Sequence, residues 1–406
     1  MYRRNRRRYR RNRILDVLLV MFLFFLVLTS VFLVMNRGYL SYQKGKRAIR
    51  KELYQTAAEC LQKATKREPS NKEYRIVYGL ALAGNGEYED ALKEFDKGIS
   101  KKNTSKAAKR NKKAYRGIGI CYFFAKNYEN SIINFDKALK IDALEYLNLD
   151  ILKYKADAQL HLGHFENAVE VYTHIIKNEK YSDDSYLKRA YAKAEGNRVD
   201  DALEDYDYVI EKNSRNFDAY LGAYTLLARE EQEEKADSYL QAALKVKPVT
   251  LDEKLKYAIV QYYFYGITDE AVESLQKLVE EKQTEAYFYL AKIAFSEEEF
   301  EKVSTYLNSY VSTEHAEHLA EAYEMLGRCA MLVKDYERAL NCFSDGISCN
   351  EVKWTRILKK NQIAVYEYLS DFDKAYDIAT EYLTDFPDDQ EIIREVEFIK
   401  TRLNRK

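Results

Sequence analysis

Two pairs of histidines have the spacing that comes nearest to a catalytic or metal-binding pattern. His161 and His164 are three residues apart, and so are His315 and His318 in the acidic segment TEHAEHLAE. On a helix this spacing places two imidazoles on one face, which binds transition metals when a third ligand completes the set. No third ligand can be identified, so we interpret these histidines as exposed polar residues and predict no metal site.

The sequence also lacks the motifs of the common enzyme classes. It contains no P-loop, no GxSxG nucleophile elbow, no HExxH zinc motif and no CxxC pair. Carboxylates are frequent, but they stand beside lysines as on ordinary solvated helix faces, for example in EEEFEKV at 297–303. We therefore predict that the protein is not an enzyme and binds no cofactor.

What recurs in the sequence is an alanine at intervals of about 34 residues. Ala57 and Ala91 are 34 residues apart, and the same spacing leads from Ala168 to Ala202 and from there to Ala236. Antiparallel helices approach closely only where small side chains face each other, so the alanine marks a repeated helix contact. The later copies are Ala271, Ala339 and Ala375, and the residues that replace the alanine in two copies are Ser131 and Val303.

This pattern resembles the tetratricopeptide repeat, a pair of antiparallel helices that stacks into a solenoid. The clearest copies are YGLALAGNGEYEDALKEFDKGI (78–99), GIGICYFFAKNYENSIINFDKAL (117–139) and LGRCAMLVKDYERALNCFSDGI (326–347). The resemblance implies an all-α, right-handed superhelical solenoid of about ten repeats over residues 38–387. These repeats start near residues 38, 72, 112, 149, 183, 217, 252, 284, 320 and 356.

Proline positions support this division of the chain. Pro69, Pro248 and Pro387 each follow a repeat alanine by 12 residues, where one repeat must end because proline interrupts a helix. In the repeat near 217 the small residues are Gly222 and Ala223, which predicts a turn one or two residues longer than elsewhere. Residues 388–406 are predicted to form a capping helix, whose apolar face consists of Ile392, Val396, Ile399 and Leu403.

Residues 14–35, ILDVLLVMFLFFLVLTSVFLVM, are almost wholly apolar. As a helix they would be about 33 Å long, against about 30 Å for the hydrocarbon core of a bilayer. The alternative is a cleaved secretory signal, whose apolar region is ordinarily about 7–15 residues long and ends in a small-x-small cleavage site. The following sequence offers no such site, so we predict an uncleaved transmembrane signal anchor.

The basic tail at 1–13, MYRRNRRRYRRNR, holds eight arginines and no acidic residue, which favours a cytoplasmic N-terminus. Six basic residues follow the span at 37–51, so the charge bias is small. We expect the repeats on the extracytoplasmic side of a bacterial cell membrane, and cytosolic repeats are the alternative. The arginines could instead bind nucleic acid, but directly before a span we interpret them as a topology determinant that touches anionic lipid.

Composition limits the other partners. The whole chain has 65 basic and 65 acidic residues, and without the tail's arginines and Asp16 the repeats carry a net charge of −7. This charge disfavours nucleic acid as a partner. The five cysteines are scattered and odd in number, so they predict no disulfide framework; Cys329 and Cys342 stand on the two helices of one repeat, and the sequence leaves open whether they pair.

In tetratricopeptide arrays the first helix of each repeat lines the inner face. Aromatic side chains on that face offer contact area with few rotamers to freeze, so we predict that it binds proteins or extended peptides. The alternative for each aromatic residue is packing between repeats. The predicted partner-binding residues are Phe123, Phe124, Tyr154, Tyr191, Tyr257, Tyr263, Phe288, Tyr289 and Phe295.

These observations favour a membrane-anchored scaffold that assembles an envelope or secretion complex. Family members that grip a C-terminal carboxylate use a clamp of Lys, Asn and Arg, whereas here Lys360 and Asn361 are isolated and Ala364 stands where an asparagine is expected. This departure argues against a chaperone co-factor. One alternative is a cytosol-facing receptor similar to mitochondrial import receptors, and another is an enzyme or metal-binding protein. The oligomeric state is not predicted.

Overall fold

The computed structural model describes residues 21, 37–313 and 316–403 of the chain. Apart from Met21, the predicted span at 14–35 lies outside these residues, as does the basic tail at 1–13. Within the described part, no helix combines the length and the apolar character that crossing a membrane requires.

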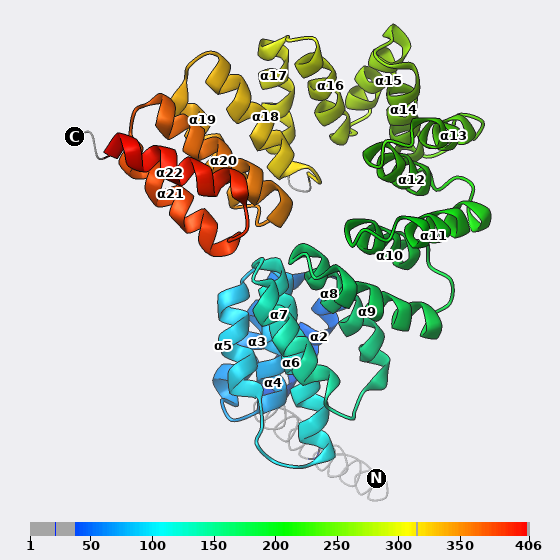
Figure 1. Ribbon diagram of the computed structural model, residues 1–406. Helices are drawn as coiled ribbons and strands as arrows, with labels where there is room; N and C mark the ends of the chain where they lie inside the picture. The colour runs from blue at the N-terminus through cyan, green and yellow to red at the C-terminus, as the bar shows by residue number, and fades with distance from the viewer. Residues whose placement is uncertain (1–20, 22–36, 314–315, 404–406) are drawn as a thin grey trace, which may run out of the picture. The chain divides into compact units, whose positions relative to one another are not determined.

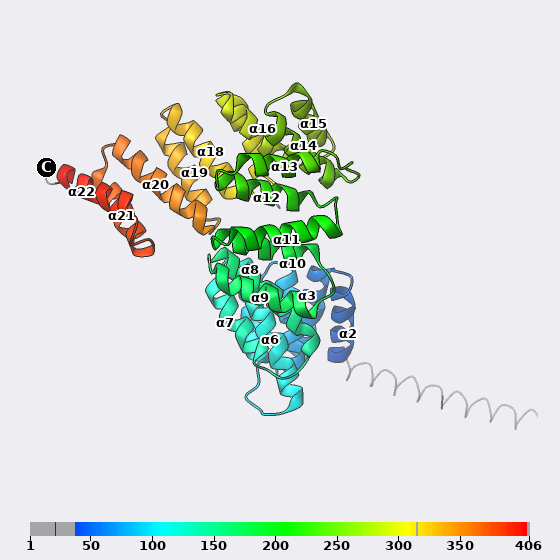
Figure 2. The same ribbon diagram turned by 45° about the vertical axis from the view of Figure 1, so that its right-hand side comes forward.

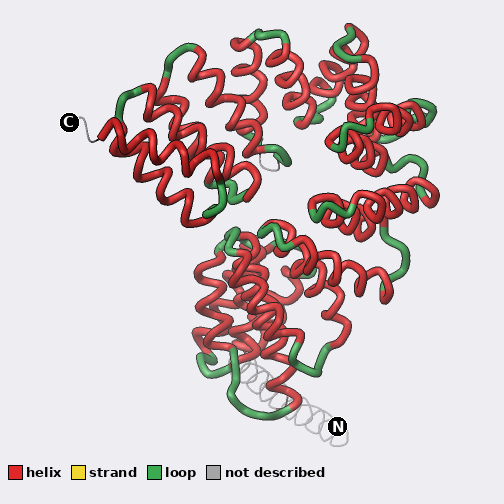
Figure 3. The backbone as a smooth tube through the Cα atoms, viewed as in Figure 1, coloured by secondary structure: helices red, strands yellow, loops and turns green. Residues whose placement is uncertain are grey.

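All regular structure in the described residues is helical (Figure 3), which confirms the predicted all-α class. Ten consecutive helix pairs are followed by a final helix, and a short 3-10 helix, η1 (Glu145–Leu147), precedes the fourth pair. The pairs are α2 (Arg37–Ile49) and α3 (Tyr54–Arg67); α4 (Lys72–Gly84) and α5 (Tyr88–Gly98); α6 (Ser105–Phe124) and α7 (Tyr128–Leu139); α8 (Asn148–His161) and α9 (Phe165–Asn178); α10 (Asp183–Glu195) and α11 (Val199–Lys212); α12 (Phe217–Arg229) and α13 (Glu233–Ala243); α14 (Leu251–Tyr265) and α15 (Asp269–Glu280); α16 (Glu285–Ser296) and α17 (Phe300–Val311); α18 (Leu319–Leu332) and α19 (Tyr336–Ile347); α20 (Val352–Tyr368) and α21 (Phe372–Asp385); α22 (Gln390–Leu403) is the final helix.

The chain divides into two compact units, the first ending at Tyr154 within α8 and the second beginning at Lys155. Inside each unit a helix packs against its neighbours in sequence (Figures 1 and 2). First helices of successive pairs also contact one another, as α2, α4 and α6 do in the first unit and α10, α12, α14 and α16 in the second. A row of first helices therefore forms a continuous face in each unit.

The repeat alanine lies where the helices of a pair touch. A Cβ placed on Gly79 would lie 2.9 Å from the ring of Phe95, and one on Gly119 would lie 2.5 Å from the ring of Phe135. The bulky residue four positions after the alanine thus fills the space that a small residue on a first helix leaves. Ser131 replaces the alanine without loss, because its hydroxyl donates to the carbonyl of Gly119 at 2.8 Å. All eight alanines of the pattern are buried: Ala57, Ala91, Ala168, Ala202, Ala236, Ala271, Ala339 and Ala375.

The turn inside each pair contains one residue in the left-handed conformation. It stands five positions before the repeat alanine or its replacement. For residues other than glycine this conformation costs about 1–2 kcal/mol, so packing of the two helices must impose it. Glycine fills the position at Gly86, Gly163 and Gly266, and larger residues fill it at Glu52, Lys126, Asn197, Glu231, Glu298, Lys334 and Ser370.

The structure corrects one prediction about these turns. Three residues connect α12 to α13, as many as connect α4 to α5, so the repeat near 217 has no longer turn. Gly222 and Ala223 are instead both used for close contacts: Ala223 is buried, and Gly222 lies under the ring of Tyr206 from the preceding pair.

Several polar side chains are buried between these helices. Asp205 of α11 is 4% exposed and forms ion pairs with Arg189 at 2.6 Å and Lys193 at 2.8 Å, both on α10. In the last pair, burial and the facing carboxylate of Glu395 on α22 raise the pKa of Glu367 to about 7. The first cluster is compensated and rigid, whereas the second is sensitive to pH.

The five cysteines are free, and four of them are buried. Burial raises the pKa of Cys121 to about 12 and that of Cys329 to about 11. The sequence left a Cys329–Cys342 disulfide open, and the structure contains two separate thiols at these positions.

Candidate binding groove

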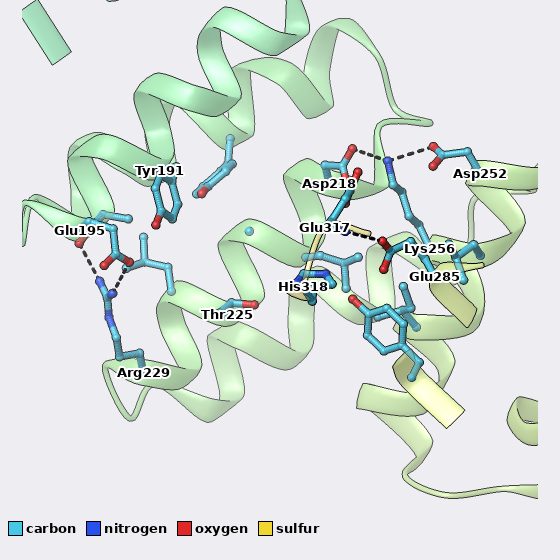
Figure 4. A pocket seen from close by; sticks show the side chains of 18 of the residues that line it. Tyr191, Glu195, Asp218, Thr225, Arg229, Asp252, Lys256, Glu285, Glu317 and His318 are labelled. Atoms are coloured by element: carbon cyan, nitrogen blue, oxygen red, sulfur yellow. Dashed lines mark hydrogen bonds and ion pairs between the residues drawn. The ribbon is translucent and has the colours of Figure 1, made fainter. Parts of the chain in front are cut away.

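A groove of about 480 Å³ lies in the second compact unit. The first helices α10, α12, α14 and α16 supply most of its lining, and α11 and the segment before α18 supply the rest. Figure 4 shows two groups of side chains, one on each side of Thr225. The cavity extends along four successive first helices and is not enclosed by a single repeat. It therefore suits an elongated ligand.

The first group contains Tyr191, Glu195 and Arg229 (Figure 4). Arg229 forms an ion pair with Glu195 at 2.8 Å and also donates to the carbonyl of Ala194 at 2.6 Å. Burial and the negative charges of Glu195 and Glu351 raise the pKa of Tyr191 to about 12. Arg229 is thus held against α10, and the Tyr191 hydroxyl stays protonated at neutral pH.

Tyr206 brings a hydroxyl to this end of the groove. The residue is 5% exposed, and no hydrogen bond of its hydroxyl is found among the described residues. Its ring fits only because residue 222 is glycine: a Cβ there would lie 2.5 Å from the ring and 2.9 Å from the hydroxyl oxygen. The hydroxyl oxygen reaches the open groove, where a polar ligand group could replace water as its hydrogen-bond partner.

The second group begins with Lys256 of α14, which bridges two carboxylates (Figure 4). Its Nζ lies 2.6 Å from Asp218 on α12 and 2.9 Å from Asp252 on its own helix. Burial lowers the pKa of Lys256, but the hydrogen bonds and charges of the two aspartates outweigh this effect and raise it. Lys256 is therefore protonated, and its positive charge is already paired with carboxylates of the protein.

Glu285 and Glu317 complete the second group, and their charges are not neutralised in this way. The Tyr310 hydroxyl lies 2.7 Å from each carboxylate oxygen of Glu285, and the backbone N–H of Glu317 donates to Oε1 at 2.8 Å. No lysine or arginine among the described residues forms an ion pair with Glu285 or Glu317. The backbone N–H of His318 donates to the Tyr310 hydroxyl at 2.8 Å, which fixes the segment before α18 against α17.

The lining of the groove is acidic as a whole. Its five carboxylates outnumber the two basic side chains, and both basic side chains are ion-paired. Burial comes first among the causes that raise the pKa of Tyr289, followed by Tyr263 and then by Glu285, Glu321 and Glu317. Tyr289 therefore lies within the electrostatic influence of Glu285 and Glu317.

Two of the predicted binding residues, Tyr191 and Tyr289, line this groove. Phe288 does not: it is 1% exposed and stacks on the imidazole of His318 with ring centres 4.6 Å apart. Tyr257 packs against Phe217, and Tyr263 against Tyr224 and Tyr262, so these two contribute to packing between repeats.

The remaining predicted residues lie elsewhere. Phe295 lines a neighbouring hollow of about 510 Å³ and lies under the guanidinium of Arg328 at 4.8 Å. Phe123, Phe124 and Tyr154 meet in the first compact unit, with ring centres 5.4–6.4 Å apart. The structure thus places two of the nine predicted aromatic residues in this groove, one in the neighbouring hollow and three in the first unit, and the other three in packing contacts.

The structure also places His318 of the second histidine pair and the isolated pair Lys360 and Asn361. His315 lies outside the described residues, His318 stacks on Phe288, and the described part of the chain holds no cluster of ligands suited to a metal ion. Lys360 forms ion pairs with Asp389 and Glu391, and the amide of Asn361 donates to Glu324. Neither residue of the isolated Lys–Asn pair is available to grip a carboxylate.

Sequence reasoning missed the charged residues of the groove. Asp218 and Lys256 are 38 positions apart, and Arg229 and Glu195 are 34 apart, so each pair joins equivalent faces of successive repeats. These ion pairs could have been predicted from the sequence, because residues of opposite charge stand about one repeat period apart on successive first helices.

Comparison with known proteins supports the repeat assignment. The sequence profiles of the tetratricopeptide repeat match residues 42–108 and 113–143. A DnaJ homolog subfamily C member 7 homolog from Dictyostelium discoideum is 26% identical over 171 residues, which is 40% of this chain and 32% of that protein. The chain therefore spans about a third of the length of this curated relative.

Solved structures are similar at lower identity. A tetratricopeptide repeat protein from Parabacteroides merdae is 18% identical, covers 63% of this chain and 99% of its own, and has a TM-score of 0.43. YrrB, described as a TPR protein with an unusual peptide-binding site, is 22% identical, covers 48% of this chain and 96% of its own, and has a TM-score of 0.40. The described part of the chain is all-α, and the profile matches assign tetratricopeptide repeats to residues 42–108 and 113–143.

Proposed function

We propose that this protein is a non-enzymatic scaffold whose second compact unit binds an extended segment of a partner protein. The observation that carries the proposal is the groove shared by α10, α12, α14 and α16, with the unpartnered hydroxyl of Tyr206 on its surface. An extended peptide has hydrogen-bonding groups along its length and would meet side chains from several first helices at once. The tyrosine rings offer contact area, and the hydroxyl offers a polar contact.

The test is photo-crosslinking in cells from a position inside the groove. Thr225 is an exposed residue of the lining, so a photoreactive amino acid there would contact a bound segment. The matched control is Asn308, which is exposed on the second helix α17 and does not line the groove. We expect discrete crosslinked partners from position 225 and none from position 308. Equal crosslinking from both positions, or none from 225, would contradict the proposal.

We further propose that residues 14–35 anchor the scaffold in a bacterial cell membrane, with the repeats outside the cytoplasm. The support is in the sequence alone: the apolar length of this segment and the eight arginines before it. In this location the scaffold would help to assemble an envelope or secretion complex. Alkaline phosphatase fused after residue 406 is expected to be active, and an inactive fusion would favour the cytosol-facing receptor instead.

A further inference from the structure

We infer that the groove selects segments with a basic side chain, which it binds between Glu285, Glu317 and the ring of Tyr289. This inference rests on the proposed function, since it names the chemistry of the segment that the same groove would bind. The occupant is a partner-protein segment with an arginine or lysine in the middle of an otherwise extended stretch.

The first argument is the difference between the carboxylates of the groove. Glu195 is paired with Arg229, and Asp218 and Asp252 share Lys256, so three of the five carboxylates have a basic partner within the protein. Glu285 and Glu317 have no basic partner among the described residues. A basic ligand group would supply the charge that this end of the groove lacks.

The second argument is that Glu285 is held in place before any ligand arrives. The hydroxyl of Tyr310, which is fully buried, contacts both of its carboxylate oxygens, and the backbone N–H of Glu317 contacts one of them. A carboxylate has about four acceptor positions, so positions remain for a ligand. A fixed carboxylate loses little entropy on binding, and it suits the planar guanidinium of arginine in particular.

The third argument is the aromatic surface beside these carboxylates. Tyr289 lines the groove within the negative field of Glu285 and Glu317, which are among the groups that raise its pKa. A cation over a tyrosine ring is attracted by the negative face of the ring, and more strongly when water is excluded. The same field would repel an acidic segment, so the groove excludes the carboxylate-terminated peptides that a basic clamp would bind.

The Tyr206 hydroxyl offers a second, polar contact to a ligand in the same groove. It lies at the opposite end, beside Tyr191 and Arg229, and its residue is buried without a hydrogen-bond partner. A segment whose basic side chain sits at Glu285 would extend across Thr225 toward Tyr191 and Arg229 (Figure 4). The two ends therefore specify one elongated ligand.

The experiment is selection of a displayed random-peptide library against the purified full-length chain, followed by affinity measurement with the selected peptides. We expect arginine or lysine to be enriched at one position. Replacing that residue by glutamine in the peptide should weaken binding at least about tenfold, which is ~1.4 kcal/mol. The double variant Glu285→Gln with Glu317→Gln should weaken the basic peptide by a similar factor, leave the glutamine peptide unchanged and flatten the salt dependence.

Controls separate failure of this inference from failure of the proposed function. Glu301→Gln removes an exposed carboxylate from α17, outside the groove, and is expected to leave affinity unchanged. Glu317→Gln alone guards against misfolding, because the side chain of Glu317 is exposed; it should show a several-fold loss. Peptides that bind Thr225→Trp as tightly as the unaltered protein would overturn the proposed function itself. Peptides whose binding is blocked by Thr225→Trp, but in which basic residues are not enriched or acidic residues are enriched, would overturn only the inferred selection of a basic side chain.

Discussion

Replacing Gly222 by alanine tests whether α12 packs against α11 of the preceding pair as the structure describes. The added Cβ would lie 2.5 Å from the ring of Tyr206, closer than carbon atoms approach without displacement. The ring is 5% exposed and cannot move freely, so α11 and α12 must separate slightly. Overpacking of this kind costs about 1–3 kcal/mol, and we expect Gly222→Ala to destabilise the contact between α11 and α12 by about 2 kcal/mol.

A second substitution should restore the lost space. Leucine occupies the position equivalent to Tyr206 in four other repeats, at Leu61, Leu240, Leu275 and Leu307, so Tyr206→Leu is compatible with the fold. We expect the double variant to be more stable than the sum of the single effects predicts, with a coupling free energy of about 1–2 kcal/mol.

Hydrogen–deuterium exchange measured by mass spectrometry is the appropriate assay. Repeat arrays often unfold in parts, so the local opening free energy of α11 and α12 is more informative than one global midpoint. Faster exchange should be confined to these helices and their neighbours. The reasoning would be refuted if Gly222→Ala exchanged like the unaltered protein, or if the effects of the two substitutions simply added.

Three further predictions concern other parts of the fold. Glu231→Gly should stabilise the protein by up to about 1 kcal/mol in thermal unfolding, because residue 231 has a left-handed φ of 57° that glycine adopts without strain. Asp205→Ala should cost about 3–5 kcal/mol in urea unfolding, because it leaves Arg189 and Lys193 partly buried without their shared carboxylate. The folded state keeps the proton of Glu367 up to a pH of about 7, whereas the unfolded state releases it near 4.5. Stability should therefore fall as the pH rises through this window, and Glu367→Gln should remove that dependence in urea unfolding at a series of pH values.

Residue spacing was sufficient to predict the helical repeats. The period of Ala202 and its equivalents reflects a steric requirement that every repeat must meet, so it is visible in a single sequence. The left-handed turn residue five positions earlier was missed, because glycine fills it at Gly86 but Glu231 and Lys126 fill it elsewhere. At these positions the packing of the two helices imposes the backbone conformation. The residue type therefore does not predict it.

The groove was predicted less completely than the fold. Counting along first helices places Tyr191 and Tyr289 on the inner face, but it does not predict how deeply each side chain is buried. Phe288, for example, is buried although it is adjacent to Tyr289 in the sequence. Which carboxylates remain uncompensated depends on contacts between successive repeats, such as that of Lys256 with Asp218. Those contacts follow from the stacking of the first helices, which the sequence does not specify residue by residue.

The most direct test of the groove as the binding surface is an exchange footprint of the protein with a bound selected peptide. We expect slower hydrogen–deuterium exchange in α10, α12, α14 and α16, with little change in the second helices α13, α15 and α17. The segment 316–318 before α18 should also be protected, because Glu317 and His318 line the groove. Protection confined to the second helices, or to the first compact unit, would contradict the assignment of this groove as the binding site.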